Sequence, residues 1–146
     1  MSIDDLYRRP GFLFRRCRQR LGALYLERAP DLDLTLQQYT VLHGLRAYPW
    51  IEQTALCDVI MLDRSTVATL LARLEEKGLV TRKPAADNRR KNLVALTPDG
   101  ETILDTVVPI LNALEVELLA GLSPGEQATL LALLARVAGG GAAEAT

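Results

Sequence analysis

The stretch LDRSTVATLLARLEEKGLVTR, residues 62–82, contains a helix start, a helix end and the beginning of a strand. Asp63 can cap the helix, because its carboxylate accepts hydrogen bonds from the free N–H groups of the first turn. Four apolar residues follow with the spacing of an amphipathic helix: Val67, Leu70, Leu71 and Leu74. Gly78 supplies a left-handed residue that ends the helix, and Leu79 makes the apolar contact that accompanies such an end. The segment therefore predicts a short helix followed directly by a strand.

Helical spacing of apolar residues and capping residues predict further helices on both sides of this segment. The expected helices cover residues 11–28, a segment that begins at Thr35 and stops at Pro49, residues 51–60, a long segment from Pro98, and a last one from Ser123.

Two details of these helices can be checked in a structure. In residues 51–60 we expect Ala55, Leu56, Val59 and Ile60 to face inward. In the long helix, Pro109 should produce a kink.

Residues 79–83 and 92–97 are rich in strand-forming residues, and the polar segment PAADNRRK joins them. This predicts a hairpin with a tip too long for a two-residue turn. Two short helices joined by a tight turn and followed by a hairpin form a winged helix-turn-helix. The expected fold is thus mainly α with a small β-hairpin wing, flanked by N- and C-terminal helices.

The net charge of −1 hides a strong asymmetry along the 146 residues. Residues 7–28 carry a net charge of +6, residues 64–91 carry +5, and residues 98–146 carry −6. Two basic stretches in a nearly neutral chain indicate a polyanionic partner at one face. The alternative is that these arginines are ordinary solvated surface residues.

Composition argues against several other classes of protein. No apolar run approaches the roughly 18 residues of a membrane span, and the N-terminus has no stretch suited to a signal peptide, so we expect a cytoplasmic protein without a membrane partner. Cys17 and Cys57 are too few for a disulfide framework or a zinc site, and His43 is the sole histidine. We therefore expect no metal, no cofactor and no catalytic residues, because convergent catalytic groups are lacking.

The polar side of the helix after Asp63 suits a DNA groove. Small residues allow close approach, hydroxyls bond phosphates or base edges, and arginine pairs with guanine. The candidates on this helix are Arg64, Ser65, Thr66, Thr69 and Arg73. The hairpin adds basic residues that can reach a minor groove or the DNA backbone: Arg82, Lys83, Arg89, Arg90 and Lys91. The alternative is that the helix face is simply exposed to solvent.

Four sequence elements resemble the multiple antibiotic resistance regulator (MarR) family: STV, LLARLEEKGLV.R, DNRR and L.ALT..G. The resemblance is close over residues 51–100 and looser over 11–137. It implies a homodimeric regulator of a palindromic operator in double-stranded DNA, often a repressor released by a small ligand. Asp87 and Arg89 match the acid-x-Arg element of the family's wing, and we expect Asp87 to orient Arg89.

The same resemblance suggests how the chain is organised. We expect a single MarR-type domain over residues 1–146, with a DNA-binding lobe at about 35–100 and dimerisation helices at about 8–30 and 98–138. Residues 139–146 are expected to form a disordered tail.

Met61 departs from the family pattern, because many members have glycine at this position in the turn between the two helices. If the backbone there needs a positive φ, Met61 costs on the order of 1 kcal/mol. A slightly different local turn would avoid that cost, and is the expectation here.

Members of this family commonly bind effectors between the dimerisation helices and the DNA-binding lobe. Candidates for contacting an effector are Arg16, Gln19, Tyr39, His43 and Arg46. The segment RRPGFLFRRCRQ is similar to the N-termini of members that control aromatic-acid breakdown, which suggests a phenolic acid or its CoA thioester as effector. A structural, hydrogen-bonded His43 is the alternative.

Two rival functions remain open for the same fold. Cys17 lies among arginines that would lower its pKa, so a thiol-based redox-sensing repressor is one rival. Its place on the apolar side of the helix instead favours packing, as does the position of Cys57. A winged-helix module that binds protein is the other rival, although such a module does not require a long basic wing.

Overall fold

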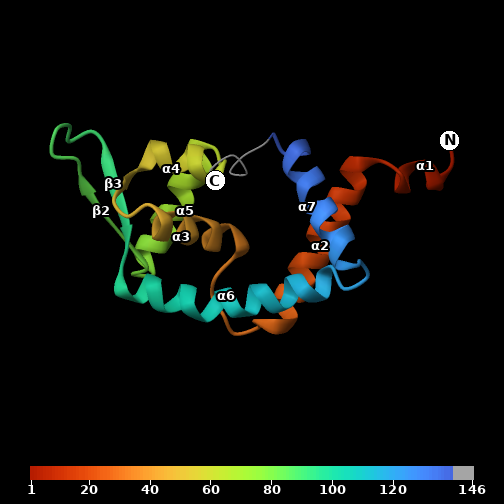
Figure 1. Ribbon diagram of the computed structural model, residues 1–146. Helices are drawn as coiled ribbons and strands as arrows, with labels where there is room; N and C mark the ends of the chain where they lie inside the picture. The colour runs from red at the N-terminus through yellow and green to blue at the C-terminus, as the bar shows by residue number, and fades with distance from the viewer. Residues whose placement is uncertain (140–146) are drawn as a thin grey trace. The chain divides into compact units, whose positions relative to one another are not determined.

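The computed structural model describes residues 1–139. The described chain divides into two compact units, one of residues Ala29–Leu111 and the other of Met1–Arg28 together with the chain from Asn112. The first unit contains α3 (Leu36–Ala47), β1 (Ile51–Glu52), α4 (Gln53–Ile60), α5 (Arg64–Glu76), β2 (Val80–Pro84) and β3 (Asn92–Leu96) (Figure 1). The second contains α1 (Ile3–Tyr7), α2 (Pro10–Arg28) and α7 (Pro124–Val137), and α6 (Pro98–Leu118) contributes residues to both units. The mainly helical fold with a small wing is confirmed.

The core of the first unit forms where α3, α4 and α5 meet the sheet. Its fully buried residues include Val41, Leu42 and Leu45 of α3, Leu56 of α4, Val67, Leu71 and Leu74 of α5, Val94 of β3, and Leu104 and Val107 of α6. The α5 stripe thus points inward as expected, which turns the polar face of α5 outward.

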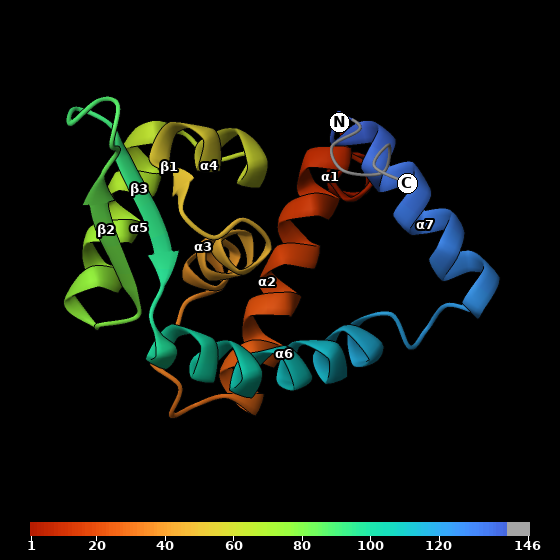
Figure 2. The same ribbon diagram turned by 60° about the vertical axis from the view of Figure 1, so that its left-hand side comes forward.

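The wing is a three-stranded antiparallel sheet with the order β1-β3-β2 (Figure 2). In the hairpin, Thr81 of β2 pairs with Ala95 of β3. On the other edge of β3, Ile51 of β1 pairs with Val94. Ile51 and Glu52 were expected to be helical, but this pairing draws them into a strand, so α4 begins at Gln53. Val59 was also expected to face inward and is instead 43% exposed.

The end of α5 fixes the base of the wing. Gly78 has φ +72°, and the N–H of Leu79 donates to the carbonyl of Leu74 at 2.9 Å, as the sequence predicted for this helix end. Thr97 donates its hydroxyl to the carbonyl of Gly78 at 2.6 Å and accepts from the N–H of Gly100 at 3.1 Å. A Cβ on Gly100 would lie 2.2 Å from the carbonyl oxygen of Leu79, so only glycine permits this close approach. The wing and the start of α6 are therefore joined to α5 through one junction.

Helix α6 continues through Pro109 and ends at Leu118. Its buried residues are Leu104, Val107, Leu111 and Leu114, in line with the predicted stripe. None of the helices in residues 1–139 combines the length and the apolar composition that crossing a membrane requires.

The second unit begins with α1, a helix that the sequence patterns did not predict. Ser2 and Asp5 form a reciprocal capping box that starts α1. Arg28, the last residue of α2, pairs with Glu117 of α6, with Nε 3.0 Å from the carboxylate oxygen. Most of the expected tail, residues 140–146, lies outside the described residues.

Met61 stands in the left-handed region, with φ +55° and ψ +43°, between α4 and α5. The expectation of a different local turn is therefore wrong, and the backbone does adopt the conformation that favours glycine. The N–H of Met61 caps α4 by donating to the carbonyl of Cys57, and its side chain is 62% exposed. The turn between α4 and α5 thus keeps its left-handed residue, and the strain at Met61 lowers the free energy of unfolding.

Replacing Met61 with glycine should raise the free energy of unfolding by up to about 1 kcal/mol, because glycine lacks the Cβ that is crowded at positive φ. Urea denaturation of the two proteins measures the difference. Met61→Ala is the matched control, since it removes the exposed side chain and keeps the Cβ. Equal stability of the glycine and alanine variants would show that residue 61 is not strained.

Candidate nucleic-acid interface

Asp63 organises the N-terminus of α5 through three hydrogen bonds. Its Oδ2 accepts from the backbone N–H of Thr66 at 3.0 Å, which confirms the predicted cap. The same carboxylate accepts from the hydroxyls of Ser65 and Thr66, each at 2.6 Å. The bond from Ser65, followed by those from Thr66, holds the pKa of Asp63 well below its usual range. The start of α5 is therefore held by three hydrogen bonds and carries an ionised carboxylate at neutral pH.

The polar face of α5 borders a shallow groove of about 300 Å³. Its lining includes Ser65, Thr66, Thr69 and Arg73, which the sequence had placed on one face, and also Gln37 of α3. Ser65, Thr69 and Arg73 are exposed. The structure thus brings four of the predicted DNA contacts together on an accessible surface. Gln37 was not predicted, because its place beside α5 depends on how α3 packs.

Some of the wing's basic residues hold the wing in place. Arg82 forms two hydrogen bonds with the carboxylate of Glu75 on α5, at 3.0 and 3.1 Å, which raise the pKa of Arg82 and lower that of Glu75. The ammonium of Lys83 lies 3.8 Å from the ring centre of Trp50, a cation–π contact. Only part of the basic charge predicted on the wing is therefore available to an outside partner.

The hairpin tip is exposed from Ala86 to Asn92. Arg89 and Arg90 extend into solvent there, and the carbonyl of Asn88 accepts from the N–H of Lys91 at 3.0 Å to shape the turn. Among the hydrogen bonds and ion pairs of the described residues, none joins Asp87 to Arg89, contrary to the expectation that Asp87 orients this arginine. The guanidinium groups of the tip are thus left for a partner.

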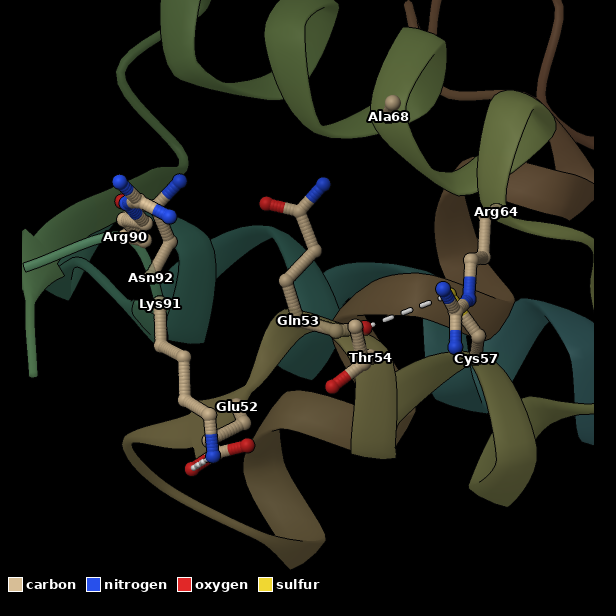
Figure 3. Close-up of a pocket in the computed structure, with 9 residues that line it drawn as sticks. All are labelled: Glu52, Gln53, Thr54, Cys57, Arg64, Ala68, Arg90, Lys91 and Asn92. Carbon is tan, nitrogen blue, oxygen red and sulfur yellow. Dashed lines mark hydrogen bonds and ion pairs between the residues drawn. The ribbon is translucent and has the colours of Figure 1, made fainter. Parts of the chain in front are cut away.

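A second hollow, of about 330 Å³, lies between α4, the start of α5 and strand β3 (Figure 3). Three predicted DNA contacts surround it: Arg64, Arg90 and Lys91. Lys91 also pairs with Glu52 at 3.4 Å, and the Gln53 side-chain oxygen is buried without a hydrogen-bond partner. One cationic residue of α5 and two of the wing therefore lie around one concave surface, whereas Arg73 lines the other groove.

The comparisons with known proteins identify this architecture. The model described as the MarR family matches residues 34–91. The transcriptional regulator HosA of Escherichia coli O127:H6 is 37% identical over 105 residues, covering 72% of this chain and 78% of HosA. This chain belongs to the MarR family.

Two solved structures resemble it closely. PcaV from Streptomyces coelicolor, in complex with its natural ligand, has a TM-score of 0.88 at 32% identity and covers 94% of this chain and 97% of its own. BpsR from Bordetella bronchiseptica, whose DNA binding is regulated by 6-hydroxynicotinic acid, has a TM-score of 0.81 at 30% identity. The match covers 90% of this chain and 94% of BpsR. This MarR-family protein is accordingly a DNA-binding transcriptional regulator and not an enzyme.

The predicted effector contacts of this MarR-family protein fall in both units. In the second unit, Arg16 donates to the side-chain oxygen of Gln19 at 3.1 Å. In the first, the hydroxyl of Tyr39 lies 3.2 Å from Nδ1 of His43, and Arg46 forms ion pairs with Glu101 and Asp105 at 2.7 and 2.8 Å. Tyr39 and His43 thus form a hydrogen-bonded pair, whereas Arg46 already has two carboxylate partners.

The two cysteines differ in their surroundings. Cys57 is buried and donates to the carbonyl of Gln53 at 3.3 Å, and burial raises the pKa of its thiol although Arg64 acts in the opposite direction. Packing, as predicted, accounts for Cys57. Cys17 is exposed, so its expected place on a packed apolar side is wrong for the single chain.

The lowered pKa of Asp63 predicts how acid affects stability. The bonds to its carboxylate contribute fully above the carboxyl's ordinary pKa of about 3.9, and the contribution is lost as the pH falls through the lower pKa of the folded state. Asp63→Asn keeps a capping side chain that does not ionise. Wild type should therefore exceed this variant in unfolding free energy by a constant amount between about pH 5 and 7, and by less below about pH 4. Urea unfolding across this range measures both proteins, and a constant difference down to pH 3 would contradict the expectation.

Proposed function

We propose that this protein is a homodimeric repressor that binds a palindromic operator and releases it when a small aromatic acid binds. One observation supports the DNA-binding mode above all: the exposed polar face of α5 is flanked by the uncompensated guanidinium groups of the wing tip. In this mode α5 enters the major groove, and Arg89 and Arg90 reach the adjacent backbone or minor groove. Asp87 lies at the same exposed tip, whereas Lys83 can take part only if DNA replaces its contact with Trp50.

The proposed dimer follows from apolar residues that the second unit leaves exposed. Helix α7 buries none of its residues, and α2 buries only Tyr25. Large apolar side chains with more than two fifths of their area exposed occur on α2, on α6 and on α7: Leu13, Phe14, Leu26, Val116, Leu131, Leu133 and Val137. Apolar surface of this extent in a small unit is typical of an interface. Two copies would also place two α5 helices on successive half-sites of a palindrome.

The proposed effector class rests on the Tyr39–His43 pair and on the relatives. Phenol and imidazole groups can bond a carboxylate or a ring hydroxyl, and BpsR, at 30% identity, responds to a hydroxylated aromatic acid. A phenolic acid or its CoA thioester is our proposed effector. Arg16 and Gln19, which belong to the second unit, stay candidates from the sequence alone. Arg46 would need to exchange a carboxylate partner for the ligand.

Arg73→Ala should weaken binding to a selected operator by about 1–3 kcal/mol and relax its base preference, because an exposed arginine on the groove face can pair bidentately with guanine. Arg89→Ala should weaken binding to selected and random duplexes alike and reduce the salt slope by about one. Fluorescence anisotropy in a salt titration measures both variants. Equal losses for Arg73→Ala on the two duplexes would contradict its role in base recognition, and salt-independent binding would contradict the proposed function.

A panel of phenolic acids and their CoA thioesters should contain a compound that both raises the melting temperature and releases the operator, since a ligand that binds the native state stabilises it. Tyr39→Phe should weaken that response while leaving operator affinity intact. Cys17→Ser is the control for the redox rival, because its exposed thiol is the group that an oxidant would reach. Release by peroxide in wild type but not in Cys17→Ser, with no response to any panel compound, would favour the rival.

A further inference from the structure

Three hydroxyls on α5 have their protons engaged inside the protein. The Ser65 and Thr66 hydroxyl oxygens each lie 2.6 Å from a carboxylate oxygen of Asp63. An ionised carboxylate can only accept hydrogen bonds, so each hydroxyl must be the donor. The Thr69 hydroxyl lies 3.0 Å from the backbone carbonyl oxygen of Ser65, which also only accepts. The direction of all three bonds therefore follows from the chemistry of the acceptors.

A hydroxyl has one proton to donate and two lone pairs to accept with. With the proton engaged, each of these hydroxyls presents only lone pairs to an outside partner. Phosphate oxygens are themselves acceptors, and the charge of Asp63 repels them. These groups are therefore poorly suited to the phosphate contacts that hydroxyls often make in DNA-binding proteins.

The major groove offers few hydrogen-bond donors. They are the exocyclic amines, N6 of adenine and N4 of cytosine, whereas guanine and thymine present acceptors there. Arg73, which lines the same groove on the protein, carries only donors. One face of α5 thus combines three hydroxyl acceptors near its N-terminus with the guanidinium donor of Arg73 one or two turns later. The acceptors suit the amines of adenine and cytosine and the donor suits the acceptors of guanine, so the face can distinguish base pairs.

The two bonds to Asp63 are strong enough to persist on binding. Oxygen–oxygen distances of 2.6 Å are typical of bonds to a charged acceptor, which are about twice as strong as neutral ones. Turning either hydroxyl outward would remove a partner from an ionised carboxylate at the start of the helix. The protein therefore meets DNA with the directions of these bonds already fixed.

We propose that Ser65, Thr66 and Thr69 act as acceptor-only groups that select an exocyclic amine of adenine or cytosine. Asp63 is the positioning residue that fixes the direction of the Ser65 and Thr66 hydroxyls, and the carbonyl of Ser65 does the same for Thr69. The inference rests on the proposed function, since it assumes that α5 enters the major groove of an operator.

The first test removes the amine from the DNA. Wild-type protein selects duplexes from a random library, and each adenine or cytosine of the selected half-site is replaced in turn by purine or 2-pyrimidinone, which lack the amine. At least one replacement should weaken binding about tenfold or more. Thr66→Val, Thr69→Val or Ser65→Ala should weaken binding to the unmodified duplex and make that replacement nearly neutral. Thr106→Val is the matched control, because its hydroxyl donates to the carbonyl of Thr102 on α6.

The second test reverses one bond. The Asp63→Asn variant still caps the helix. Its new amide group donates to one of the two neighbouring hydroxyls, whose own proton then faces outward. Selection with Asp63→Asn should change the preferred base at one position from adenine or cytosine to thymine or guanine, a change that lost helix stability alone would not produce.

Different failures have different meanings. If no amine replacement weakens binding, or if the three hydroxyl variants lose equal affinity for selected and random duplexes, the hydroxyls do not select amines and the inference is wrong. If wild-type protein binds no duplex at all, the proposed function fails and the inference falls with it.

Discussion

The first unit, which carries α5 and the wing, depends most on the hydrogen bonds that the Asp63 carboxylate accepts. This carboxylate ends the turn after α4, satisfies the N–H of Thr66 and holds two hydroxyls at the start of α5. The turn requires a left-handed residue, which Met61 provides against the preference of its Cβ. Because the cap and the exposed hydroxyls share one carboxylate, the stability of the helix and the chemistry of its surface cannot change independently.

The wing is held by a second set of contacts at the other end of α5. Glu75 fixes Arg82, the junction of Gly78 with Thr97 fixes the strand ends, and Trp50 holds the ammonium of Lys83. These contacts order the base of the hairpin and leave its tip to reach outward. The basic wing is thus divided between residues that position it and residues that are free for a partner, a distinction that charge counting does not make.

Local patterns in the sequence predicted most of the fold, because caps, helix ends and apolar stripes depend on residues close together in the chain. Asp63, Gly78 and the α5 stripe occupy the expected positions. Two positions were missed where distant residues decide. Ile51 is strand because β3 lies beside it, and Gln37 joins the groove because α3 packs against α5. The capping box of α1 was visible in the sequence as Ser2 and Asp5, but the helix is too short to show an apolar period.

The charge distribution explains how a nearly neutral chain can attract a polyanion. The acids of α6 neutralise arginines elsewhere: Glu101 and Asp105 bind Arg46, and Glu117 binds Arg28. Arg64, Arg73 and the guanidinium groups of the wing tip have no such carboxylates in the described ion pairs. Salt screens charges over about 10 Å at 0.1 M ionic strength, so a local excess governs the approach of DNA and the net charge does not. Moving a few acids from α6 to the wing would keep the net charge of −1 and would remove the attraction.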